Sequence, residues 1–214
     1  MSQGSVMADT ELHVGVRAVA GLADDAVDAF LRSVESDELR LEFDQADDVG
    51  VYASALEWLM PTAIVAYVAK PYFEGFLAAA GEDHYRSLKA SLAKLASEVA
   101  GPGGPRLRLV GSRGKVPTDD PTFSLAFSVY AGIESGLRFK LLIPNGIGAE
   151  SIEQIVGLFL DTIRTLHDGS YVEGSIAGLD GVNPVYGTIA VVYSAEHELF
   201  FVHDAHRRGN DAAT

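Results

Sequence analysis

The 214-residue sequence contains no cysteine. This absence excludes disulfide bonds, cysteine-ligated zinc, iron–sulfur clusters and a thiol nucleophile, and it fits a reducing compartment. The first ten residues are polar and lack the apolar segment that a secretion signal requires. We therefore expect a cytoplasmic protein.

Basic residues are also scarce, because 16 Lys and Arg stand against 30 Asp and Glu, which leaves a net charge of −14. The imbalance is greatest near the N-terminus, where residues 1–50 carry a net charge of −9. A surface of this sign repels nucleic-acid backbones and anionic lipid headgroups. The charge therefore argues against a nucleic-acid partner and favours a protein partner or self-association.

The uncharged stretch from residue 58 to residue 69 is too short to cross a membrane, since a spanning helix requires about 20 largely apolar residues. The pattern over Ala55–Ala69 predicts a very apolar helix, with Pro61 either in its first turn or at a kink. An amphipathic helix follows over Glu82–Val99. We predict that this second helix covers part of the first.

The apolar region, residues 54–81, has three possible roles. It can be buried in the core, it can be held in an interface with a partner, or it can leave the fold and enter a membrane conditionally. The aromatic residues that flank the uncharged stretch suit each of these positions. The residues that we single out for an interface or a membrane are Trp58, Pro61, Tyr67, Tyr72, Phe73 and Phe76.

The N-terminal segment predicts a strand, a helix and a second strand. Alternating apolar residues predict strands over Glu11–Arg17 and Leu39–Phe43, and apolar residues at helical spacing predict a helix over Asp24–Ser36. This unit has the length of a crossover between parallel strands. Two antiparallel strands with a helix laid across them are the alternative.

Gly101–Pro105 is the clearest break in the chain, and the pattern changes after it. The strands predicted after the break are residues 106–110, 123–130, 137–143, 188–193 and 198–202. The second and third of these strands, and the last two, are expected to form hairpins. The capping-box spacing of Ser151 and Gln154 predicts the start of a long helix that ends at Asp168.

These elements predict an α+β protein. It consists of an N-terminal strand–helix–strand unit, a central helical pair with one very apolar helix, and a mostly antiparallel sheet with one long helix. The break at Gly101 divides the chain into residues 1–100 and 106–206, and a single fused domain is the alternative.

The histidines near the C-terminus are the candidates for a metal site. They are His197, His203 and His206. On a strand, His197 and His203 point to one face whereas Glu198 and Asp204 point to the other, which separates the imidazoles from the acids. A metal held by the three histidines is one interpretation, and a solvated strand end is the other.

Three further motifs carry no assigned chemistry. Asn145–Gly148 could hold a phosphate at a helix N-terminus, but it lacks the third glycine of the dinucleotide fingerprint. Asp83–Tyr85 suits either proton transfer or a helix cap with a solvent-facing histidine. No serine lies in a nucleophile-elbow context. We therefore predict no cofactor and assign no catalytic residue.

The segment Ala69–Leu77, followed by Gly81–Tyr85 and Leu88–Lys89, resembles a segment of functionally uncharacterised bacterial proteins. The resemblance is confined to this part of the chain. It implies a bacterial source, and it implies no activity and no site residues.

The sequence favours a non-enzymatic protein that acts through protein–protein interaction, as a regulatory or accessory component. The reasons are the lack of a catalytic motif, the acidic composition and the apolar 54–81 region. The first alternative is a protein that acts conditionally on membranes through residues 54–81. The second alternative is an enzyme or small-ligand-binding protein that uses the His197–His206 end or the Asn145 loop.

Overall fold

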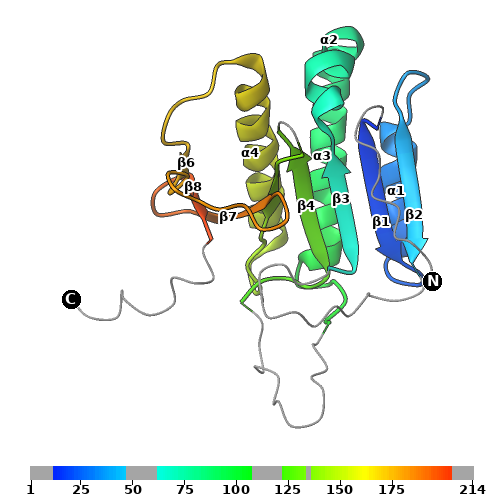
Figure 1. Ribbon diagram of the computed structural model, residues 1–214. Helices are drawn as coiled ribbons and strands as arrows, with labels where there is room; N and C mark the ends of the chain where they lie inside the picture. Colours follow the sequence, from blue (N-terminus) through cyan, green and yellow to red (C-terminus); the bar gives the residue numbers. More distant parts are fainter. Residues whose placement is uncertain (1–11, 47–61, 108–121, 134–135, 204–214) are drawn as a thin grey trace.

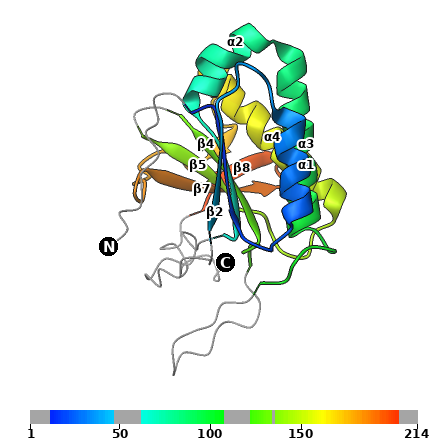
Figure 2. The same ribbon diagram turned by 90° about the vertical axis from the view of Figure 1, so that its right-hand side faces the viewer.

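The computed structural model describes residues 12–46, 62–107, 122–133 and 136–203 (Figure 1). Their strands form one eight-stranded sheet in the order β2-β1-β3-β4-β5-β7-β8-β6. The helices pack against one face of this sheet, as Figure 2 shows from the side. Neighbouring strands are parallel at some positions and antiparallel at others, so the class is mixed α/β.

β1 (Val14–Val19), α1 (Asp24–Val34) and β2 (Leu41–Ala46) form the N-terminal unit. β1 and β2 are parallel, which confirms the crossover and excludes the antiparallel alternative. Asp24 and Asp25 lie in the first turn of α1, where negative charge stabilises the helix dipole. The apolar stripe of α1 is buried, so the helix covers this end of the sheet.

The central strand β3 (Ile64–Val68) overturns the prediction of an apolar helix over Ala55–Ala69. It lies between β1, to which it is antiparallel, and β4, to which it is parallel. A short continuous apolar run is typical of a buried helix and of a buried strand, and the helix was the wrong choice. Three of the five β3 residues are β-branched, which favours a strand. The part of the predicted helix before residue 62 lies outside the described residues.

After β3 the chain becomes helical, through the π-helical turn η2 (Tyr72–Phe76), α2 (Leu77–Ala80) and α3 (Glu82–Ala100). α3 confirms the predicted amphipathic helix to within one residue. Gly81 separates α2 from α3 with a φ of +82°, a conformation that favours glycine. The described part of the expected helical pair is therefore a strand followed by these helices.

The C-terminal part contains β4 (Phe127–Gly132), β5 (Arg138–Leu141), α4 (Ala149–Asp168), β6 (Ile176–Ala177), β7 (Thr188–Ser194) and β8 (Leu199–Val202). The antiparallel pairs β4–β5 and β7–β8 confirm both predicted hairpins. β5–β7 and β6–β8 are parallel, so the prediction of a mostly antiparallel sheet is wrong. β7 follows β5 only after α4 and β6, and this long connection, unlike a hairpin turn, lets the two neighbouring strands run in the same direction.

α4 begins before the predicted capping box. Gly148 is its N-cap residue, and Ser151 lies inside the first turn. Gly169 ends the helix with a φ of +76°, as the predicted stop after Asp168 requires. The predicted strand over residues 106–110 lies mostly outside the described residues.

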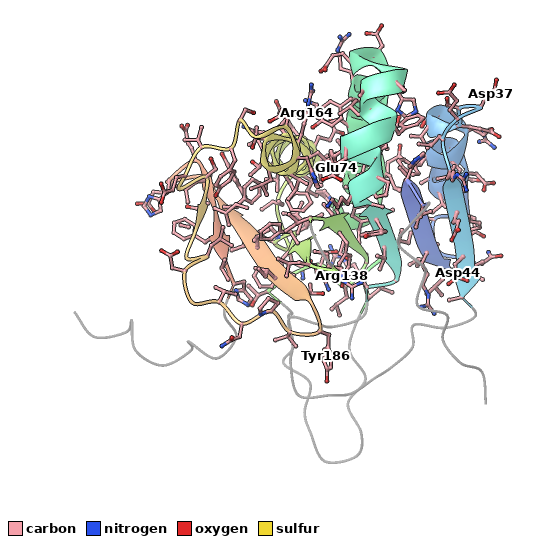
Figure 3. All side chains as sticks on the ribbon, turned by 45° about the horizontal axis from the view of Figure 1, so that its top comes forward. Asp37, Asp44, Glu74, Arg138, Arg164 and Tyr186 are labelled. Carbon is pink, nitrogen blue, oxygen red and sulfur yellow. The ribbon has the colours of Figure 1, made fainter. Side chains whose placement is uncertain are left out.

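Polar contacts join α3 to α4. Asp161 accepts hydrogen bonds from the Tyr85 hydroxyl at 2.8 Å and from the Lys89 ammonium at 2.9 Å. Arg164, labelled in Figure 3, pairs with Glu82 at 2.8 Å and lies over the Tyr85 ring. Burial, and then the charge of Asp161, raises the pKa of Tyr85, which therefore stays a neutral donor.

Candidate interaction surface

β2 is an edge strand, because β1 is its only neighbour in the described sheet. It lies at the right of Figure 1 and faces the viewer in Figure 2. Glu42, Phe43, Asp44 and Gln45 are exposed, and Phe43 is 45% exposed although it is apolar. An exposed edge strand with an apolar ring is a template for pairing with another chain.

The backbone bonds between β2 and β1 show which groups of β2 are directed outward. The carbonyl groups of Arg40 and Ala46 accept hydrogen bonds from the β1 side at 2.9 to 3.2 Å. Successive residues of a strand direct their backbone groups to opposite sides. The amide and carbonyl groups of Leu41, Phe43 and Gln45 therefore point away from β1.

The surface around β2 is acidic. Residues 12–46 contain eight acids and three bases, and all eleven side chains are exposed. Asp44 forms an ion pair with Arg17 at 3.4 Å, and exposed pairs of this kind contribute little to stability. Asp44 lies on β2 and Asp37 lies in the turn before it, and both are labelled in Figure 3. We call β2 together with the exposed acids of residues 12–46 the acidic edge.

Part of the apolar region predicted as an interface or a membrane segment is a strand. Trp58 and Pro61 lie outside the described residues. Tyr67 lies on β3 and is half-buried, at a position whose neighbours Ala66 and Val68 face the helices. No helix within the described ranges is long and apolar enough to span a membrane.

The other three residues predicted for an interface or a membrane are buried. Tyr72, Phe73 and Phe76 are at most 7% exposed and belong to the hydrophobic core. The Tyr72 hydroxyl lies 3.1 Å from Nδ1 of His84, and the Phe73 ring stacks on His167 at 4.8 Å. Burial raises the pKa of Tyr72. These aromatic residues therefore hold η2 on the core and are not available to an interface or a membrane in this structure.

The motif around His84 holds neighbouring elements together. Asp83 pairs with Arg86 at 3.1 Å on the surface of α3. Nε2 of His84 lies 3.3 Å from the Val34 carbonyl of α1, and Tyr85 bonds to α4. The three side chains therefore contact three different parts of the fold, which indicates a structural role.

The histidines predicted as a metal site have separate surroundings. The His197 ring contacts Phe201 at 5.5 Å, and the His203 ring contacts Phe123 at 5.0 Å. His206 lies outside the described residues. Among the residues that the structure does describe, no three metal-ligating side chains form a group that could hold an ion. Metal binding by the three histidines stays a prediction.

The glycine loop of Asn145–Gly148 precedes α4, as a phosphate loop would. Gly148 is the residue just before the helix. The Asn145 side-chain amide donates to the Phe123 carbonyl at 3.1 Å, which ties the loop to the chain before β4. Phosphate binding by this loop stays a prediction.

The sequence analysis missed two cations on the face of the sheet that carries no helix. Lys140 of β5 is 1% exposed, and burial lowers its pKa from 10.5 to about 8. Arg138 and Lys140 lie over the Tyr130 ring at 5.7 and 5.3 Å. Their alternation within the predicted strand was the available signal, since residues i and i+2 share a face.

No protein-family model, curated protein or solved structure matches the chain. The class that its geometry defines is a mixed α/β protein with helices on one face of a single sheet and an acidic strand at one edge.

Proposed function

We propose that the protein acts without catalysis, as a regulatory or accessory component that binds a partner protein at the acidic edge. The observation that carries the proposal is β2, an exposed edge strand with acids on and around it. The occupant is an extended segment of the partner, rich in Lys and Arg, which adds to β2 as a further strand. Its cations meet Glu42 and Asp44 across the new pair of strands.

A second copy of the chain fits this edge poorly. If two β2 strands paired antiparallel about Phe43, Glu42 of each copy would face Asp44 of the other. Like charges directly opposite each other destabilise a pair of strands, and charged edge residues commonly prevent such pairing. The same acids attract a basic strand, so the edge selects its partner by charge.

This charge argument predicts that E42K promotes dimers. The substitution places a cation opposite Asp44 of the other copy, and twofold symmetry creates this pair twice. Sedimentation velocity at low salt should show more dimer for E42K than for the wild type, and about 0.5 M NaCl should reverse the difference. E173K makes the same charge change in an exposed loop and should not dimerise. Equal dimerisation of both variants would show that net charge alone controls association.

Labelled peptides test the proposal directly. A peptide of alternating valine and lysine should bind in fluorescence anisotropy at low salt, whereas its valine–glutamate counterpart should not. E42Q/D44N should decrease the affinity for the valine–lysine peptide about fivefold, because two exposed ion pairs together contribute about 1 kcal/mol. E173Q/E196Q removes two exposed acids away from β2 and should bind as the wild type does.

A third peptide separates strand addition from diffuse charge attraction. It carries the same lysines with proline in place of valine, and proline cannot donate a hydrogen bond to an edge strand. Strand addition requires this peptide to bind much more weakly than the valine–lysine peptide. Equal binding of the two, or failure of the valine–lysine peptide to bind, would refute the proposal.

A further inference from the structure

A cavity of about 580 Å³ lies at the opposite end of the sheet from the acidic edge. Its walls are β7, β8, Ala177 of β6 and the glycine-rich connection from residue 178 to residue 185, which joins β6 to β7. Apolar surface comes from Val185, Ala190 and Phe201, among others. A cavity of this size accommodates a small organic molecule.

Thr188 connects the cavity to Arg138. Thr188 lines the cavity, and its hydroxyl oxygen accepts a hydrogen bond from Nε of Arg138 at 2.9 Å. Arg138 and Thr188 are direct neighbours in the parallel pair β5–β7. This bond holds the guanidinium beside Thr188, a residue of the cavity wall; Arg138 is labelled in Figure 3.

The Arg138 guanidinium has donors to spare. A guanidinium carries five N–H donors, and the bond to Thr188 uses one of them. Within the described residues, no carboxylate pairs with Arg138, although the chain has a net charge of −14. The side chain is exposed, so its remaining donors are accessible to a ligand.

Lys140 adds a second positive charge behind the cavity wall. It is the β5 neighbour of Ala190, which lines the cavity with a small side chain. Burial of Lys140 weakens the screening of its charge by water. Arg138 and Lys140 therefore place positive charge next to two residues of the cavity wall, Thr188 and Ala190, which favours an anion on this side of the cavity.

We propose that this cavity binds a small organic anion, a carboxylate or phosphate on an apolar body. The anionic group pairs with the outer donors of Arg138, which match the two oxygens of such a group. The body lies against Val185 and Phe201. The site is independent of the acidic edge, so a failure of peptide binding there does not affect it.

Four probes of similar size test the charge requirement: phenyl phosphate, benzoate, benzyl alcohol and benzylamine. In ¹H–¹⁵N NMR titrations of the full chain, the two anions should shift the amide signals of residues 177–190 and 201–203. Benzyl alcohol should bind at least about tenfold more weakly, because it lacks a charged acceptor. Tighter binding by benzylamine than by benzoate would overturn the proposal and identify Asp180, the carboxylate in the lining, as the anchor.

R138Q should decrease the affinity for phenyl phosphate about tenfold, because it removes a charge-assisted pair from an exposed position. R32Q, at an exposed arginine of α1, should leave the affinity unchanged. Equal loss in both variants would mean that only the overall charge matters and would overturn the site. Inorganic phosphate tests the role of the cavity, because binding as tight as that of phenyl phosphate would show that the apolar walls contribute nothing.

Discussion

Replacing Lys140 with methionine should increase the free energy of unfolding at pH 7 by about 2 kcal/mol. Lys140 is 1% exposed, and burial lowers its pKa from 10.5 to about 8. Keeping its ammonium protonated in the folded protein therefore costs about 1.4 kcal/mol for each pH unit of this difference. Methionine has a similar volume and no charge. The lost attraction to the Tyr130 ring offsets part of the gain.

The pH dependence of K140M identifies the cause. Since the folded pKa of Lys140 is about 8 and the unfolded value is 10.5, the unfolded chain binds more protons between these pH values. Wild-type stability therefore gains a rising contribution through this window, which K140M lacks. The advantage of K140M should shrink above about pH 8 and vanish near pH 10.5.

Urea unfolding between pH 7 and pH 10 measures this effect. K94M is the matched control, because Lys94 is 69% exposed and its replacement should change stability little at any pH. A K140M protein that is less stable than the wild type at pH 7 would contradict the prediction. It would mean that the partners of the Lys140 ammonium stabilise it by more than burial destabilises it.

Replacing Gly187 with alanine should decrease the free energy of unfolding by about 3 kcal/mol. Gly187 has a φ of +72°, which costs an alanine about 1 kcal/mol. The new Cβ would also lie 2.6 Å from the Gly136 carbonyl oxygen, a backbone atom that cannot move alone. The backbone at Gly187 or Gly136 must therefore move to relieve this contact. Because the Gly187 carbonyl accepts a hydrogen bond from the Arg138 amide at 2.9 Å, such a movement disturbs the pairing of β5 with β7.

Gly174 provides the matched control for G187A. It lies in the connection between α4 and β6 with a φ of +92°, and nothing stands within 4 Å of a Cβ added there. G174A should therefore decrease the free energy of unfolding by about 1 kcal/mol, which is the cost of holding an alanine at a positive φ. Urea unfolding of both variants measures the difference. An equal loss of stability in G187A and G174A would contradict the prediction. It would show that the backbone at Gly136 moves away from the new Cβ without a cost in free energy.

The helices α1, α3 and α4 were predictable because each buries one stripe of apolar residues, and this spacing is visible in a single sequence. The hairpins β4–β5 and β7–β8 were predictable because their strands are separated by short turns. β3 was not predictable as a strand, because its five consecutive apolar residues are too few to distinguish the spacing of a strand from that of a helix. The pairing of β3 with β4 was also inaccessible, since it joins residues far apart in the sequence.

The acidic edge was predictable in its charge and not in its position. The net charge of −9 over residues 1–50 is a property of the sequence. That β2 ends the sheet follows from strand order, which a single sequence does not contain. The bond between Arg138 and Thr188 was hidden for the same reason, because it connects neighbouring strands that are separated by α4 in the chain.

During synthesis, β3 leaves the ribosome long before its neighbour β4, because β3 ends at Val68 and β4 begins at Phe127. β1 can cover one edge of β3 at once, whereas the other edge waits for β4. The nascent chain therefore carries an apolar, unpaired strand edge at what becomes the centre of the protein. Such an edge is prone to aggregation and is a natural binding site for chaperones that act on growing chains.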